Sequence, residues 1–206
     1  MSVNARLRSV LLQGGLSSGK LMTDNCEIVK SSPSSVNASV ASSGLTAGGP
    51  NPNGTFCHVE TPFLTQFKVS GAYTLPWQEI QVSGAYQDLP GPEILANGAF
   101  TSAQVAPSLG RALSQGSTAS IPLVAPGTRY GERMHQLDWR VAKTVRVGRT
   151  RIQGQFDLYN ALNASPIRAY RGAYGATTGS RTGSAFLIPG VVLPARLLKV
   201  GMQLTF

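Results

Sequence analysis

The chain has no long hydrophobic run. None of its 206 residues lies in a stretch approaching the roughly 18 consecutive apolar residues of a membrane-spanning helix, which excludes a helical membrane protein. Residues 1–15 lack an uninterrupted apolar core and a small-residue cleavage site, so they are not a signal peptide. If the protein is exported, we expect its export signal, and the true beginning of the chain, to precede Met1.

Charged residues are also scarce, at 13% of the chain, and the net charge is +9. A basic surface is what phosphate binding requires, which raises nucleic acid as a partner. The cations stand singly at alternate positions and form no Lys/Arg cluster or RNP-type aromatic motif, so we predict no nucleic-acid binding. Phosphate-rich lipid head groups or anionic solutes suit this spacing equally well. The cations considered are Arg6, Arg8, Lys68, Arg140, Arg146, Arg151 and Lys199.

Residues that carry catalytic or metal chemistry are few. Two cysteines do not make a structural zinc site, and two histidines, His58 and His135, do not make a convincing transition-metal site. Cys57 and His58 are sequence neighbours, an awkward geometry for a nucleophile and its base, and no third triad member is visible. The Gly-rich residues 172–184 lack the GK[ST] of a phosphate loop. We therefore expect a protein that is not an enzyme and has no cofactor or metal.

The most informative segment that is present is the last one, PARLLKVGMQLTF. Its apolar residues alternate with polar or small ones, as a membrane-spanning strand of about 9–11 residues requires. A half-buried strand of a soluble sheet has the same period, so both interpretations stay open at this point. One face carries Leu198, Val200, Met202, Leu204 and Phe206, and the other carries Lys199, Gly201, Gln203 and Thr205.

A hairpin is predicted around Gly148. A two-residue Gly-Arg loop between Val147 and Thr150 suits a type II′ turn, because glycine adopts the positive φ of the first central position without strain. Pairing Val147 with Thr150 places Arg140 opposite Asp157 on one face. On the other face it predicts the apolar pairs Trp139–Leu158, Val141–Phe156 and Val145–Ile152.

Two features of this register need an explanation. It opposes Arg146 and Arg151, which is tolerable only in water near the turn, and it puts Lys143 on the apolar face. A lipid-facing lysine costs up to about 2–4 kcal/mol at the bilayer midplane and little near an interface. We therefore expect Lys143 to reach toward the turn, unless the assignment of faces is wrong.

The connections between the predicted strands are unequal. Val3–Leu21 is predicted as one loosely alternating strand, and Phe63–Tyr73 and Ile80–Gln87 form a hairpin that repeats the pattern VSGAY. Polar segments rich in Ser, Gly, Asn and Pro, residues 23–62, 88–134 and 161–192, are predicted as long loops. The total is six strands, with short turns at one end and long loops at the other. Soluble sandwiches rarely show that asymmetry, whereas outer-membrane barrels do.

Three segments carry a family resemblance. They are FKVSGAYTLPWQEIQVSGAYQDLPGPEI, PGTRYGERMHQLDWRVAKTVRVGRTRIQGQFDLYNALNASP and PARLLKVGMQLTF. In this order they resemble the carboxy-terminal portion of TonB-dependent outer-membrane receptors, especially large receptors with a carboxypeptidase-regulatory-like amino-terminal domain. The resemblance implies an all-β fold: residues 1–206 as one antiparallel transmembrane β-barrel segment of about six strands, with long extracellular loops and short periplasmic turns. Earlier strands and the plug domain are absent, so the chain resembles a truncated portion of a receptor.

The resemblance also implies a function and partners. It implies energised solute uptake in the bacterial outer membrane, with the rest of the barrel and plug and, through the missing amino-terminal part, the TonB system. Lipopolysaccharide, outer-membrane lipid and the barrel-assembly machinery are the other implied partners, and Phe206 resembles the terminal aromatic of the assembly signal. The alternative is a soluble all-β binding or adhesion domain, which a detergent requirement would distinguish. The transported ligand stays open.

Two further expectations concern the loops. In an oxidising compartment, a disulfide between Cys26 and Cys57 would close a loop of about thirty residues and contribute roughly 3–4 kcal/mol in the chain-entropy model. Exposed aromatic and basic residues of the loops are candidates for solute recognition. They are Tyr130, Arg133, Tyr170, Arg171 and Tyr174.

Overall fold

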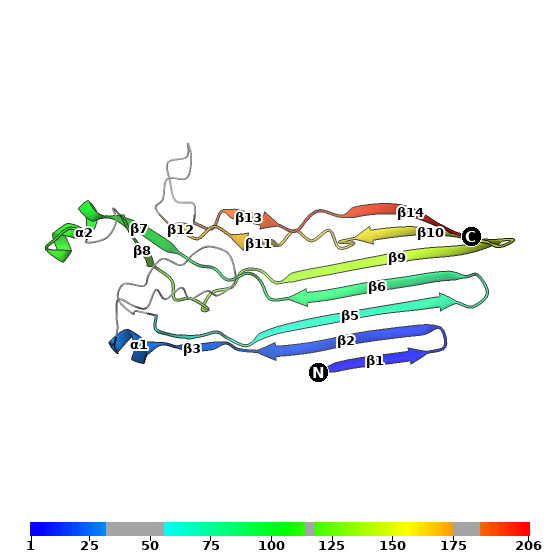
Figure 1. The fold of residues 1–206 in the computed structure, drawn as a ribbon, viewed down its shortest axis with the longest axis horizontal. Helices are drawn as coiled ribbons and strands as arrows, with labels where there is room; N and C mark the ends of the chain where they lie inside the picture. Colours follow the sequence, from blue (N-terminus) through cyan, green and yellow to red (C-terminus); the bar gives the residue numbers. More distant parts are fainter. Residues whose placement is uncertain (32–55, 114–117, 175–185) are drawn as a thin grey trace.

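The chain is built around one antiparallel sheet of seven strands (Figure 1). The structure, a computed structural model, describes residues 1–31, 56–113, 118–174 and 186–206. Neighbours in the sheet follow one another along the chain, in the order β1-β2-β5-β6-β9-β10-β14. The strands are β1 (Ser2–Leu7), β2 (Val10–Gly19), β5 (Leu64–Leu75), β6 (Ile80–Leu89), β9 (Met134–Val147), β10 (Thr150–Tyr159) and β14 (Leu197–Thr205).

The two ends of the sheet differ, as the sequence indicates. At one end, which we call the turn end, residues 8–9, 76–79 and 148–149 link successive strands (Figure 1). Gly148 has a φ of 61°, the positive value that the first central residue of a type II′ turn requires. The opposite end, the loop end, carries the longer connections.

The connections at the loop end contain regular structure that the sequence interpretation as long polar loops missed. The first has β3 (Met22–Asp24) paired with β4 (His58–Glu60), and α1 (Cys26–Ser31). The second has β7 (Asn97–Thr101), α2 (Ser102–Leu109) and β8 (Thr118–Pro122), with β12 (Ala173–Tyr174) pairing onto β7. The third contains β11 (Ile167–Tyr170) and β13 (Pro189–Val192).

Local signals account for α2. Thr101 caps its first turn in a capping box with Gln104, and the helix ends at Gly110, whose φ is 72°. The sequence therefore contains an N-terminal capping motif, Ser/Thr-x-x-Gln, and a C-terminal glycine for this helix. The surrounding Pro, Gly and Ser residues nevertheless favoured the prediction of a loop.

The prediction of one strand over Val3–Leu21 was wrong. The segment is a hairpin in which Leu7 pairs with Val10 across a two-residue turn, and the sheet therefore has seven strands rather than six. The apolar positions are odd-numbered before the turn and even-numbered after it. This change of phase made the alternation look loose, and no glycine or asparagine marked the turn.

The register predicted around Gly148 is confirmed. Val147 pairs with Thr150, Trp139 with Leu158 and Arg140 with Asp157. The final strand joins the same face, because Val200 lies opposite Phe156. With seven strands, β1 and β14 both run toward the turn end, and within the described residues they are the two open edges of the sheet.

Candidate functional site

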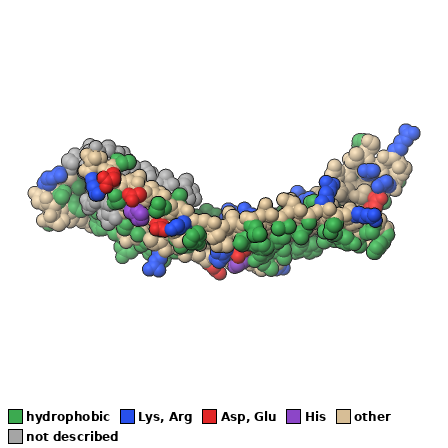
Figure 2. Space-filling model, turned by 90° about the horizontal axis from the view of Figure 1, so that it is seen from below, with side chains coloured by type: hydrophobic (Ala, Val, Ile, Leu, Met, Phe, Trp, Pro, Cys, Tyr) green, Lys and Arg blue, Asp and Glu red, His purple; other side chains and the backbone are tan. Residues whose placement is uncertain are grey.

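One face of the sheet is apolar across all seven strands. The registers place Val3, Leu12, Val82, Val141 and Val200 on this face, with further apolar side chains above and below them. Figure 2 shows the hydrophobic side chains gathered in a band along one side of the sheet. We call this surface the apolar face.

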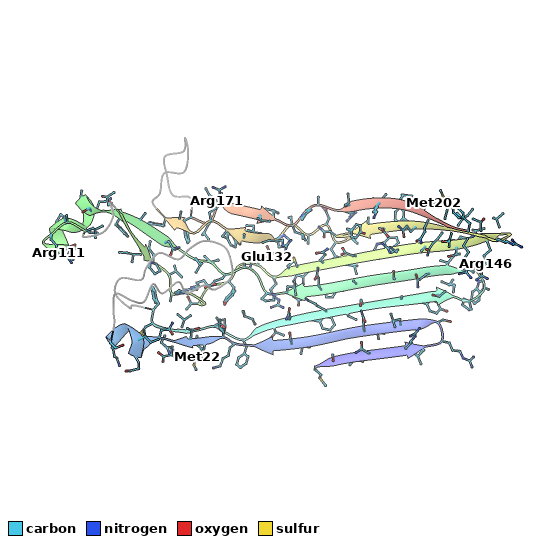
Figure 3. The ribbon with its side chains drawn as sticks, in the orientation of Figure 1. Met22, Arg111, Glu132, Arg146, Arg171 and Met202 are labelled. Carbon is cyan, nitrogen blue, oxygen red and sulfur yellow. A yellow bond between two sulfur atoms is a disulfide. The ribbon has the colours of Figure 1, made fainter. Side chains whose placement is uncertain are left out.

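The apolar face is exposed. Val200 is 73% exposed, Met202 69% and Val3 60%; Met202 is labelled on β14 in Figure 3. Among the residues that the structure describes, only Ala96, Ala142 and Leu193 are buried hydrophobic residues. The described chain therefore supplies no second layer that covers this face.

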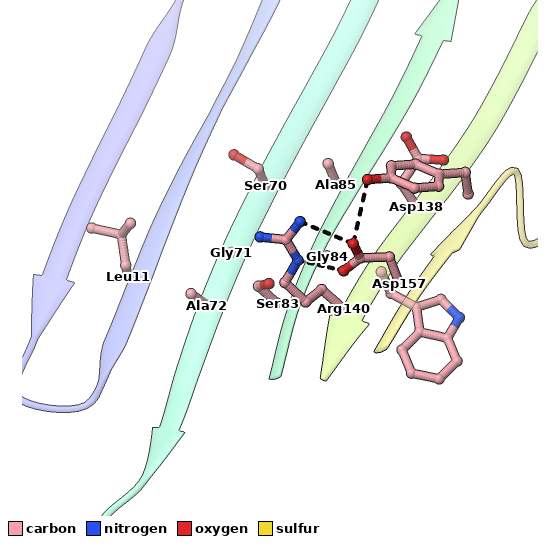
Figure 4. Close-up of a pocket in the computed structure, with 12 residues that line it drawn as sticks. Leu11, Ser70, Gly71, Ala72, Ser83, Gly84, Ala85, Asp138, Arg140 and Asp157 are labelled. Atoms are coloured by element: carbon pink, nitrogen blue, oxygen red, sulfur yellow. Dashed lines mark hydrogen bonds and ion pairs between the residues drawn. The ribbon is translucent and has the colours of Figure 1, made fainter. Parts of the chain in front are cut away.

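The opposite face, the polar face, is organised around an ion pair. Arg140 of β9 donates from Nε and Nη2 to the two carboxylate oxygens of Asp157 on β10, the second bond measuring 3.1 Å. Asp157 is 2% exposed, whereas the Arg140 side chain is 44% exposed. Tyr159 lies 3.5 Å from the same carboxylate. Figure 4 shows Arg140 and Asp157 together, joined by dashed lines.

Small residues make room beside Arg140. The two VSGAY segments pair with each other in antiparallel register, Val69 opposite Tyr86 and Gly71 opposite Gly84. Their Ser and Ala residues line the polar face, and a depression of about 300 Å³ lies between them and Arg140 (Figure 4). The repeat thus solves the same packing problem on two neighbouring strands, as the sequence pattern indicated.

Amides and a second carboxylate extend the polar face toward the loop end. Gln87 donates to Gln136 at 3.0 Å, and Gln136 donates to Asp138 at 3.0 Å. Asp138 also accepts a 2.7 Å bond from the backbone N–H of Asn160. Asn160 is 3% exposed and donates to the carbonyls of Ala164 and Pro194, tying the end of β10 to the segment before β14. Sequence reasoning did not single out Asn160.

Polar pairs border the apolar face at the loop end. Tyr86 Oη lies 3.2 Å from His135 Nδ1, and Arg133 donates to Asp88 at 2.9 Å and to the carbonyl of Thr65 at 2.8 Å. These hydrogen bonds hold Arg133, a predicted solute-recognition residue, at the loop end of the sheet. Its partner Asp88 is 45 residues away in sequence, and no local pattern links the two.

A disulfide joins Cys26 and Cys57 beside the β3–β4 pair, the pairing considered from the sequence. The backbone N–H of Cys26 and the nearby His58 side chain lower the pKa of Asp24 below its usual value. The hydrogen bond from Lys20 similarly lowers the pKa of Glu60. These carboxylates therefore protonate at a lower pH than unpaired ones.

The remaining solute-recognition candidates make separate contacts. Tyr170 of β11 packs against Gly131, where an added Cβ would come within 2.6 Å of its ring. Tyr130 pairs with Glu93 in an isolated bridge, and burial, with the Glu93 charge, raises the pKa of its hydroxyl. Arg171 is exposed (Figure 3), and the ring of Tyr174 lies edge-on to Phe186, with ring centroids 5.9 Å apart.

Comparison with protein-family models, with curated proteins and with solved structures finds no match in any of the three. No three His, Cys, Asp or Glu side chains gather into a metal site within the described residues. No helix in the described part of the chain is long and apolar enough to span a membrane. The two faces and two ends of the sheet are the features from which function can be inferred.

Proposed function

We propose that the chain forms part of the wall of a transmembrane β-barrel in the bacterial outer membrane. The observation that carries the proposal is the exposed apolar face, which runs across seven strands and lies opposite a polar face. In this arrangement the apolar face contacts lipid and the polar face lines a water-filled lumen. By the sequence resemblance, the barrel is the carboxy-terminal portion of a TonB-dependent receptor that takes part in energised solute uptake.

The size of the apolar face supports lipid as its covering. Monomeric soluble proteins rarely expose contiguous apolar patches larger than a few hundred Å². Burial of apolar surface stabilises by about 25 cal/mol per Å², so a face of seven strands left in water would be strongly unfavourable. The β9 and β10 strands, of 14 and 10 residues, reach the 9–11 residues that a tilted spanning strand needs.

The polar face suits a lumen. Its central ion pair keeps the Arg140 side chain 44% exposed, which requires water on that side. The amides of Gln87 and Gln136 and the carboxylate of Asp138 extend the same wettable surface. A hydrocarbon environment on this face would leave these groups without solvation.

Strand direction indicates what else the barrel contains. Because β1 and β14 run the same way, they cannot close on each other as antiparallel neighbours. A closed antiparallel barrel therefore needs an odd number of further strands between these two edges, which fits the missing part of a receptor barrel. Copies related by rotation about the barrel axis would meet β14 to β1 in parallel, so a ring of copies does not satisfy this requirement.

A spin-label scan tests the proposal. Single cysteines would be labelled with nitroxides in the chain reconstituted in lipid. They are placed at two pairs of neighbouring positions, each with one residue on either face: Val82 with Gln81, and Val200 with Lys199. The Cys26–Cys57 pair, kept oxidised, does not react. We expect the labels at Val82 and Val200 to collide preferentially with oxygen, which dissolves in hydrocarbon. Labels at Gln81 and Lys199 should collide preferentially with a water-soluble nickel chelate.

The alternation within each pair is the decisive result, since neighbouring labels share the same strand and depth. Equal accessibility of both members to the nickel chelate would contradict a lipid-facing surface. A monomer that unfolds cooperatively without detergent, with the Val82 and Val200 labels shielded from both reagents, would instead support the soluble all-β binding or adhesion domain.

A further inference from the structure

The charges at the turn end are strongly unbalanced. Of the nine acidic side chains in the sequence, only Glu79 lies there, and the cations exceed it six to one. Figure 2 shows blue side chains at this end, and Figure 3 labels Arg146 there. We call the six cations the basic rim: Arg6, Arg8, Lys143, Arg146, Arg149 and Arg151.

Ion pairing leaves most of this charge uncompensated. Glu79 pairs with Arg146 at 3.2 Å, and within the described residues no ion pair reaches Arg8, Arg149 or Arg151. At the loop end, by contrast, Lys20 pairs with Glu60, Lys30 with Glu27 and Arg133 with Asp88. Arg129, Arg168 and Arg171 at the loop end also lack an ion pair within the described residues, but six of the nine acidic side chains lie at that end, so the larger excess of positive charge is at the turn end.

The basic rim is continuous with the apolar face. Lys143 lies on that face, opposite Ile80 and Gly154, and a Cβ added to Gly154 would meet no atom within 4 Å. The lysine side chain thus has open space beside it and can extend toward the turn end. Trp77, in the turn of residues 76–79, is 75% exposed, and tryptophan favours the boundary between hydrocarbon and head groups.

We propose that the basic rim binds the head groups of anionic phospholipids at the turn end of the sheet. This inference rests on the proposed function, which places the apolar face in a bilayer. Arg8 and Arg149, in the turns, supply guanidinium groups that match phosphate oxygens in a bidentate geometry, and Lys143 supplies a point charge from within the apolar face. The other three cations, Arg6, Arg146 and Arg151, lie on the polar face. Each cation near an anionic membrane surface strengthens association about fivefold at moderate salt.

Lipid selectivity measures this interaction. The intact chain would be reconstituted in phosphatidylcholine with a trace of spin-labelled phosphatidylglycerol or spin-labelled phosphatidylcholine, and the motionally restricted fraction of each label would be compared. We expect roughly fivefold selectivity for phosphatidylglycerol. It should fall to about one in the variant Arg8→Gln/Lys143→Gln/Arg149→Gln and at 1 M NaCl, where the Debye length is about 3 Å.

A matched variant at the loop end, Arg129→Gln/Arg168→Gln/Arg171→Gln, removes the same charge and should keep the selectivity. Equal restricted fractions of both lipids in the wild type would overturn the inference while leaving membrane insertion intact. Loss of selectivity in the loop-end variant alone would also overturn it. So would displacement of the restricted phosphatidylglycerol by 20 mM inorganic phosphate at constant ionic strength or by a DNA oligonucleotide. No restricted fraction of either lipid would instead contradict the proposed function, and the inference would fall with it.

Discussion

At the residue scale, the most constrained side chain is Asp157. It is 2% exposed, and its two carboxylate oxygens accept hydrogen bonds from Arg140. Replacing Arg140 by Met leaves this buried carboxylate without its cation, and an unpaired buried charge is unfavourable. We therefore predict that Arg140→Met lowers the midpoint of urea unfolding in detergent micelles.

Arg151→Met is the control for this prediction. Arg151 lies on the same face of the neighbouring strand, is exposed, and stands opposite Arg146 rather than an acid. Its replacement should leave the midpoint unchanged or raise it slightly, because it relieves a like-charge pair. Equal losses from Arg140→Met and Arg151→Met would show that the ion pair contributes nothing specific.

A second prediction concerns the titration of Asp24. The Cys26 amide is the largest cause of its lowered pKa and His58 the next. The stability contributed by this carboxylate is present above the usual aspartate pKa and is lost as the pH falls through the lowered value. In His58→Ala, we expect the pKa measured by carboxyl NMR to rise only part of the way to its usual range. Full recovery would assign the shift to His58 rather than to the amide.

Some residue contacts were predictable and others were not. Arg140–Asp157 followed from one hairpin register, because both residues lie a few positions from the same two-residue turn. Arg133 and Asp88 are 45 positions apart in the sequence, so their contact depends on how the intervening segment folds. The roles in solute recognition proposed for the five loop residues stay predictions: Tyr130, Arg133, Tyr170, Arg171 and Tyr174.

At the scale of single elements, the Gly148 turn can be tested directly. Its φ of 61° is unfavourable for a residue with a Cβ by about 1–2 kcal/mol, so Gly148→Ala should destabilise the β9–β10 hairpin by that amount. Gly154→Ala is the matched control. It lies within β10, where a Cβ meets nothing within 4 Å, and alanine there should be neutral or stabilising by about 0.5 kcal/mol. Urea unfolding of the two variants checks the difference, and an equal effect would contradict the turn assignment.

The contribution of the disulfide can also be tested separately. The disulfide links residues separated by 31 positions, and removing it releases chain entropy worth about 3–4 kcal/mol in the simplest model. In Cys26→Ser/Cys57→Ser we expect faster hydrogen exchange at the amides of Asn25 and Thr61, which bond across the β3–β4 unit. Amides of β9 should be unaffected. Faster exchange throughout the sheet would instead make the disulfide a global constraint.

Element prediction succeeded where alternation was strict. The β9, β10 and β14 strands keep one phase from end to end, so their faces could be predicted, together with the register between β9 and β10. The β1–β2 hairpin changes phase at residues 8–9 without a glycine, and the short strands of the loop end are two to five residues long. Such strands depend on their partners rather than on their own pattern, and the sequence predicted loops there.

At the scale of the whole molecule, an all-β architecture followed from the lack of long apolar runs and the repeated period-2 segments. The common direction of the two edge strands did not, because it depends on the strand count, and one missed turn changed that count from six to seven. An even count would have let the two edge strands run in opposite directions. The observed count makes them run the same way, with consequences for how the chain behaves alone.

The last prediction is that these 206 residues do not conduct solute as a monomer. Seven strands are fewer than the eight of the smallest outer-membrane barrels, and β1 and β14 cannot pair antiparallel with each other. In hydrocarbon, each unpaired backbone group at these edges is unfavourable by several kcal/mol. We therefore expect the purified chain to require detergent or to aggregate, and its reconstituted monomer to give no solute flux when flux and particle mass are measured together. A conducting monomer would contradict the assignment of the sheet to part of a larger barrel wall.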